Sequence, residues 1–308
     1  MELQPFDNEI WTGRIDYEDG KLGIRIHQII QKYSDQSNGK VLLGFCSEEG
    51  VKRNKGRLGA KSAPNEIRKM MANLPVHTNE LKVYDFGNLV VDEDLEEATN
   101  KQVQLVSSII TNHSFPVVIG GGHETALGTY LGFIKHYPKN SLVINIDAHF
   151  DIRKPNPIST SGTPFYEMNE YCKSNNLDFN YLVLGIQEPG NTKALFHRAD
   201  EMQIEYVLAD EIHANFNRVL EDLKVYIEKF EHIYLSLDMD VFDVAYAPGV
   251  SATTINGLTP FQVKYLIKFL KKTEKIKVFD LVEVNPLYDR DNQTSKLAAQ
   301  MIYEVLKD

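Results

Sequence analysis

Short apolar runs recur along the chain and alternate with longer amphipathic segments. Residues 41–45, 82–86, 115–119, 142–144, 182–186, 204–208, 233–237 and 278–282 have the length and apolar character of buried strands. Residues 64–73, 92–110, 125–136, 215–230, 260–272 and 294–306 are typical of helices, as is a segment after residue 192. This alternation, without a Pro/Gly/Ser-rich linker, predicts an α/β fold with a parallel sheet in a single domain, 1–308.

The first 38 residues are mixed and polar, and we expect an irregular N-terminal arm with one helix at about 22–33. The net charge of -10 argues against nucleic acid or an anionic membrane surface as partner. No run of about 18 apolar residues predicts a membrane span. The N-terminus lacks the pattern of a signal peptide, and the only two cysteines, Cys46 and Cys172, fit a reducing compartment. We therefore expect a cytoplasmic protein.

Polar clusters follow four of the predicted strands, at 120–124, 147–151, 238–240 and 283–285. Ligands of open α/β sheets bind outside the carboxyl ends of the strands. Asp147, His149 and Asp151 stand at every second position, so they would share one face of a strand or surround one point in a bending loop. His123 on its own is better explained as a hydrogen-bonded core histidine. Together with Asp147, His149 and Asp238 at other strand ends, it is better explained as a metal ligand.

The candidate metal ligands are His123, Asp147, His149, Asp151, Asp238 and Asp240. Four carboxylates packed together would repel strongly, and two divalent cations would balance them. Oxygen ligands with two imidazoles favour Mn²⁺ over Zn²⁺ or Ca²⁺. A water bridging two such ions is a hydroxide nucleophile near neutral pH. No serine elbow occurs, and neither cysteine lies in a cluster, so we expect two Mn²⁺ to do the chemistry.

These segments resemble the arginase/ureohydrolase family: 120–124 (GGGHE), 147–151 (DAHFD), 236–243 (SLDMDVFD) and 283–286 (EVNP). The resemblance implies an eight-stranded parallel sheet with helices on both faces, and a dinuclear manganese cluster that hydrolyses amidine or guanidine C–N bonds. It implies two ligand sets: His123, Asp147, Asp151 and Asp238 for one ion, and Asp147, His149, Asp238 and Asp240 for the other. Asp151 would also hydrogen-bond the hydroxide, and Glu283 would pair with the amidinium group.

Within the family, three details resemble the formimidoylglutamases. They are the SGTPF stretch at 161–165, Arg153 after the metal stretch, and GGGHETA at 120–126. This resemblance implies that Arg153, Ser161 and Asn191 bind the substrate, with the Arg153 fork on a carboxylate. Arg153 as a surface ion-pair residue and Ser161 as a turn hydroxyl stay open alternatives. Arg57 is a weaker candidate for carboxylate binding.

The expected reaction is hydrolysis of N-formimidoyl-L-glutamate to L-glutamate and formamide, by attack of the bridging hydroxide on the formimidoyl carbon. Asp151 is the expected proton source for the leaving nitrogen. The partner would be a small-molecule substrate, and the family resemblance implies a homo-oligomer. Two alternatives are another ureohydrolase (arginase, agmatinase or guanidino-acid hydrolase) and a catalytically silent metal-binding oligomer.

Overall fold

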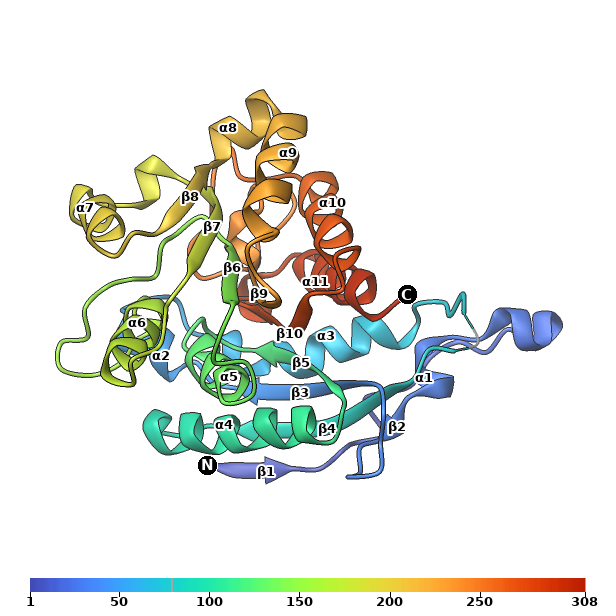
Figure 1. Ribbon diagram of the computed structural model, residues 1–308. Helices are drawn as coiled ribbons and strands as arrows, with labels where there is room; N and C mark the ends of the chain where they lie inside the picture. Colours follow the sequence, from blue (N-terminus) through green and yellow to red (C-terminus); the bar gives the residue numbers. More distant parts are fainter. Residues whose placement is uncertain (79, 308) are drawn as a thin grey trace.

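A computed structural model, which describes residues 1–78 and 80–307, is built around one large twisted sheet (Figure 1). Its strand order is β1-β4-β3-β5-β10-β9-β6-β7-β8, and β2 pairs with β4. The strands are β1 Glu2–Gln4, β2 Gln31–Lys32, β3 Lys40–Cys46, β4 Val83–Val90, β5 Phe115–Gly120, β6 Ser141–Ile146, β7 Tyr181–Ile186, β8 Glu205–Leu208, β9 His232–Asp238 and β10 Ile276–Val282. Only β1 runs antiparallel to its neighbour among these pairs.

Helices cover both faces of the sheet. The α-helices are α1 Ile26–Ile29, α2 Glu49–Arg53, α3 Ala63–Ala72, α4 Leu95–Thr111, α5 Thr125–Ile134, α6 Pro164–Ser174, α7 Lys193–Glu201, α8 Ala209–Ala214, α9 Phe216–Ile227, α10 Pro260–Lys271 and α11 Gln293–Leu306. Five 3-10 turns accompany them: η1 Tyr17–Gly23, η2 Ala60–Ser62, η3 Glu188–Gly190, η4 Met239–Val241 and η5 Pro286–Tyr288. Among the described residues, none of these helices combines the length and apolarity that a bilayer crossing requires.

Alternate strand residues point to opposite faces, which produces two cores. On β3, Leu42 belongs to the core that α3, α8, α9, α10 and α11 cover, whereas Leu43 belongs to the core under α4, α5, α6 and α7. On β6, Ile144 and Val143 divide between the two cores in the same way. Burial on both faces explains why the strands read as continuous apolar runs.

The predicted α/β architecture is confirmed: all eight predicted strands form and run parallel to one another. The sheet has two further short strands that were not predicted, β1, antiparallel to β4, and β2. All the strands share one sheet, which supports the prediction of a single domain. The predicted helix at 22–33 is wrong, because that stretch contains the end of η1, the four-residue α1 and strand β2. Gly20 in η1 has a positive φ of 54°, which a helix cannot include, and the β-branched isoleucines that follow have a low helix propensity. Both features disfavour a continuous helix in this part of the chain. Helices α2, α6 and α8 were not predicted.

The N-terminal arm is tied to the sheet by a buried ionic network. Arg68 of α3 donates to both carboxylate oxygens of Asp85 on β4, at 2.9 and 2.8 Å. The Trp11 indole N–H donates to the same carboxylate at 2.8 Å, and Arg68 also reaches the carbonyl of Gly87 and the side chain of Asn88. Because both charges are buried and fully hydrogen-bonded, removing either would leave the other uncompensated.

Arg68→Met should lower the free energy of unfolding by about 3–5 kcal/mol, because it leaves the Asp85 carboxylate buried without its counter-ion. Urea denaturation followed by circular dichroism measures the effect. Lys69→Met is the matched control. Lys69 is the next residue of α3, and within residues 1–78 and 80–307 its ammonium pairs only with Glu66, at the surface, so its loss should cost under about 1 kcal/mol. Equal denaturation midpoints for the two variants would contradict this account.

Candidate metal centre

The candidate ligands lie at the carboxyl ends of four strands that are neighbours in the sheet, in the order β5, β10, β9, β6. His123 follows β5, and Asp147, His149 and Asp151 follow β6. Asp238 ends β9, Asp240 lies in the η4 turn after it, and Glu283 follows β10. The strand order therefore brings together residues that are up to 160 positions apart in the chain.

Two groups of side chains can each hold an ion, and they share Asp147. In the first, His123 Nδ1 lies 3.3 Å from Asp147 Oδ2 and 3.0 Å from the Oδ2 atoms of both Asp151 and Asp238. In the second, His149 Nδ1 lies 3.1 Å from Asp240 Oδ2 and 3.6 Å from Asp147 Oδ1. The structure thus brings all six candidates together. Asp238 falls in the first group only, so its predicted role for both ions stays a prediction.

The charges of this cluster need compensation. Burial raises the pKa of the Asp238 carboxyl well above its ordinary value, and the neighbouring Asp240 and Asp147 raise it further. Burial lowers the pKa of both histidines, but the surrounding aspartates outweigh burial and hold it well above the ordinary value. Asp238 thus resists ionisation and the two histidines favour the cationic form, so cations bound here would stabilise the ionised carboxylates.

Divalent cations fit this donor set. His123 Nδ1 and Asp240 Oδ1 are buried and have no hydrogen-bond partner among the described residues. An imidazole nitrogen that faces three carboxylate oxygens without a hydrogen bond is arranged as a metal ligand rather than as a core histidine. Its other nitrogen, Nε2, lies 3.1 Å from Ser236 Oγ, a contact that orients the ring.

Neighbouring residues hold the loop after β6 in place. Asp147 Oδ2 accepts from the Asn145 amide at 2.9 Å, and Asp147 Oδ1 accepts from the backbone N–H of His149 at 2.7 Å. Asn191 accepts from the backbone N–H of Phe150 and donates to the carbonyls of Ala148 and Gln187. The Asn191 amide is therefore occupied in fixing the loop, and this geometry gives no support to the prediction that it binds substrate.

Two residues predicted to be catalytic adopt strained backbone conformations. Asp151 has φ 47° and Glu283 has φ 66°, in the left-handed region that costs a non-glycine residue about 1–3 kcal/mol. Glu283 is buried, and its Oε1 accepts from the backbone N–H of His123 at 2.8 Å. Burial raises the pKa of its carboxyl to about 8, and Glu124 and Asp240 contribute in the same direction. A cation beside Glu283 would restore its charge.

The other predicted site residues lie in the loops after β6 and β3. Arg153 is exposed, and its guanidinium makes no hydrogen bond or ion pair with the described part of the chain. Ser161 is buried, and its Oγ accepts from Asn54 Nδ2 at 3.3 Å. Arg57 instead donates to the carbonyls of Ser251 and Val250 and stacks on a tyrosine ring, so it supports a loop.

Glu124 is a site residue whose role the sequence did not indicate. It is buried, and its Oε1 accepts from Ser47 Oγ at 2.6 Å and from the backbone N–H of Gly50 at 3.0 Å. It thereby connects the loop after β5 to the loop after β3, next to Glu283. Its place directly after His123 in the GGGHE stretch was the only signal.

A profile of the arginase family matches residues 39–307. The chain belongs to the arginase family. A formimidoylglutamase of Aeromonas hydrophila is 37% identical over 313 residues, covering 99% of both chains, and one of Vibrio parahaemolyticus is 40% identical, covering 96% of this chain and 92% of that one. The crystal structure of Trypanosoma cruzi formiminoglutamase with Mn²⁺ has a TM-score of 0.83 at 25% identity, covering 92% of this chain and 97% of that one. These comparisons confirm the family resemblance seen in the motifs.

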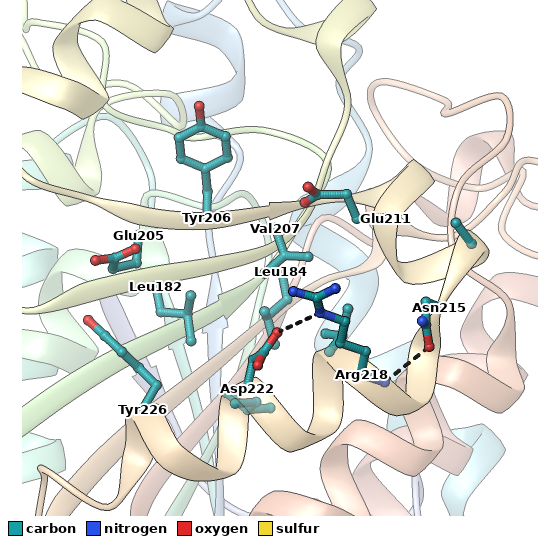
Figure 2. A pocket seen from close by; sticks show the side chains of 13 residues that line it. Leu182, Leu184, Glu205, Tyr206, Val207, Glu211, Asn215, Arg218, Asp222 and Tyr226 are labelled. Atoms are coloured by element: carbon teal, nitrogen blue, oxygen red, sulfur yellow. Dashed lines mark hydrogen bonds and ion pairs between the residues drawn. The ribbon is translucent and has the colours of Figure 1, made fainter.

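Two cavities differ in their relation to this arginase-family centre. One, of about 530 Å³, is bordered by His149 and by residues 186–190 and 253–256, so it opens beside the second ligand group. The other, of about 580 Å³, lies between the edge strand β8 and helix α9, and Figure 2 shows Arg218 and Asp222 paired on its rim. It shares no residue with either ligand group. The first cavity is therefore the candidate approach to the centre.

We expect this arginase-family protein to bind two divalent cations per chain, and single substitutions should separate them. His123→Asn should lose one cation and His149→Asn the other, whereas Asp147→Asn should lose both, because Asp147 belongs to both groups. Equilibrium dialysis followed by elemental analysis measures the stoichiometry. His197→Asn, on the exposed face of α7, is the control and should keep both. Full occupancy in the Asp147 variant would contradict the proposed sharing.

Proposed function

We propose that this protein hydrolyses N-formimidoyl-L-glutamate to L-glutamate and formamide, as a formimidoylglutamase-type hydrolase with two Mn²⁺ per chain. The observation on which this rests is the pair of ligand groups sharing Asp147, directly beside the buried Glu283. The relatives of similar length are formimidoylglutamases, and the T. cruzi formiminoglutamase was crystallised with Mn²⁺. The oxygen-rich ligand set with two imidazoles suits that ion.

The protein's own residues would orient the substrate and move protons. When bound, two Mn²⁺ supply Lewis-acid activation of water and of the substrate. Glu283, held through Oε1 by the His123 backbone, would pair with the cationic amidinium group and position its carbon for attack. Asp151 would hold the proton of the nucleophile and deliver it to the leaving nitrogen. The strained backbone at both residues fits such a demand for fixed positions.

The substrate's carboxylates require positive or donating groups outside the carboxylate-rich metal centre. Arg153 is the proposed partner of one carboxylate, because its guanidinium is exposed and has no partner in the described chain. The Ser161 hydroxyl accepts from Asn54 and keeps its own proton available for donation. These two residues are the proposed substrate-binding pair.

Location and assembly are further parts of the proposal. A cytoplasmic location is supported by Cys46 and Cys172, which are buried free thiols. A homo-oligomer is supported by an aromatic cluster on α9 and α10. The ring centre of Tyr265 lies 5.7 Å from that of Phe216 and 6.1 Å from that of Phe261. Phe261 is 70% exposed and Tyr265 is 44% exposed, and a contiguous exposed aromatic patch of this kind is typical of a surface that another copy covers. Sedimentation of the protein and of Phe261→Glu tests this: a monomer in both cases contradicts the assembly.

The direct test of the reaction uses the manganese-loaded protein with N-formimidoyl-L-glutamate. We expect stoichiometric glutamate and formamide, and loss of turnover after removal of the metal by a chelator, with recovery on adding Mn²⁺. Arginine and agmatine are the comparison substrates. Urea from either, without turnover of N-formimidoyl-L-glutamate, would replace the proposed reaction by another ureohydrolase activity. No turnover of any amidine or guanidine by the loaded protein would indicate a silent metal-binding protein.

Glu283→Gln should lower kcat/KM about 10- to 100-fold, because a charge-assisted pair with the amidinium becomes a neutral hydrogen bond. Steady-state kinetics measure this, and elemental analysis should show unchanged metal content, since Glu283 belongs to neither ligand group. Glu228→Gln, on the surface after α9, is the control. If Glu283→Gln loses metal in proportion to activity, Glu283 acts on the centre rather than on the substrate.

A further inference from the structure

Glycine at position 162 leaves room for two donor side chains that come from different loops. A Cβ at this position would lie 3.0 Å from Arg153 Cδ, 3.4 Å from Arg153 Nε and 3.3 Å from Asn54 Nδ2. The backbone N–H of Arg153 donates to the Gly162 carbonyl at 2.8 Å, which fixes the start of the arginine side chain. The guanidinium of Arg153 and the amide of Asn54 therefore gather around one point, next to Ser161.

These three side chains, which we call the Gly162 donor cluster, have unused donors. Asn54 Nδ2 donates one N–H to Ser161 Oγ, which leaves its second N–H free. No described residue accepts from the Ser161 hydroxyl, and none pairs with the Arg153 guanidinium in the described ranges. Guanidinium, amide and hydroxyl donors converging on one point match the several lone pairs of a carboxylate.

The two other arginines of the same loop are already occupied. Arg53 is paired with Glu49 and Glu96, and Arg57 is bound to the carbonyls of Val250 and Ser251. The candidate metal centre is rich in carboxylates, so a dianionic substrate needs donors for its own carboxylates outside that centre. The Gly162 donor cluster contains such donors on Asn54, Arg153 and Ser161.

The loop bearing Asn54 is held in place. Asn54 is the C-cap residue directly after helix α2, and its backbone N–H donates to the Gly50 carbonyl at 2.9 Å. The buried Glu124 accepts from Ser47 and Gly50 at the start of the same loop, directly after the candidate ligand His123. Donors that are already positioned lose little entropy on binding, so Asn54 can contribute to affinity at small cost.

We propose that Asn54 is a specificity-determining residue: together with Arg153 and Ser161, its side-chain amide receives one of the two carboxylates of the amidine substrate. Asn54 thus favours amidines derived from acidic amino acids over uncharged or cationic ones. This inference rests on the proposed function, because it assigns a role in binding that substrate. It adds a residue that no motif in the sequence indicated.

The test compares Asn54→Ala and Asn54→Asp with the unaltered, manganese-loaded protein. Asn54→Ala should raise KM for N-formimidoyl-L-glutamate about 10-fold, which corresponds to the loss of about 1.4 kcal/mol, with kcat nearly unchanged. Asn54→Asp, of almost the same shape, should raise KM further, because a carboxylate there would repel the substrate and pair with Arg153. Lys55→Ala, the next exposed residue, is the control.

Substrate analogues identify the group that Asn54 contacts. N-formimidoyl-L-glutamine lacks the side-chain carboxylate, and 4-(formimidoylamino)butyrate lacks the α-carboxylate. The Asn54 variants should keep the KM of the unaltered protein for one of these two analogues only. An equal effect on all three substrates, or a fall in kcat instead of a rise in KM, would overturn the inference and leave Asn54 with a structural role.

Gly162→Ala is an independent test of the Gly162 donor cluster. Its methyl group would displace Arg153 and crowd Asn54, so it should reproduce the KM rise and its dependence on the analogue. Unchanged KM in this variant contradicts the cluster. If the unaltered protein does not turn over N-formimidoyl-L-glutamate, the proposed function has failed; if it does but the Asn54 variants match it, only the present inference has failed.

Discussion

The mutual repulsion of four aspartates at one edge of the sheet is the constraint on which the rest of this site depends. Asp147, Asp151, Asp238 and Asp240 lie beside two histidines, and three of the four are buried. Charges of one sign at this separation are stable only when cations balance them. Cation binding is therefore part of what makes this arrangement compatible with a folded protein, as well as part of the proposed chemistry.

The positions of the ligands could be predicted because a simple rule connects sequence to space. Parallel strands are buried apolar runs, and polar residues directly after several such runs meet at one edge of the sheet. His123, Asp147 and Asp238 follow this rule, so the strand ends alone placed them together. The same reasoning recovered eight of the nine strands that pair in parallel and missed only the two-residue β2. This reasoning works because helices cover both faces of the sheet, so every residue of a strand is buried and the strand is apolar throughout.

The errors have an equally physical origin. The isoleucines of residues 22–33 have helix-like spacing. The end of this stretch instead pairs with β4 as strand β2, and Gly20 just before it has a non-helical backbone. The role of Asn191 in substrate binding stays a prediction, although its amide is hydrogen-bonded to three backbone groups. Conversely, Asn54 lies in a basic loop about 100 residues from Ser161 and Arg153. Contacts between loops depend on loop conformation, which residue periodicity does not encode.

The position of β10 in the middle of the sheet has a consequence for how the protein reaches this state. β10 is the last strand in the chain, yet it pairs with β5 on one side and β9 on the other. Until it inserts, the two halves of the sheet have no common hydrogen-bonded ladder, and both inner edges are open to association with other chains. His123 and Asp238 then belong to separate half-sheets. During synthesis on the ribosome, the metal centre would thus be among the last features to form. A protein that binds the cations would be one in which β10 has already joined the two halves of the sheet.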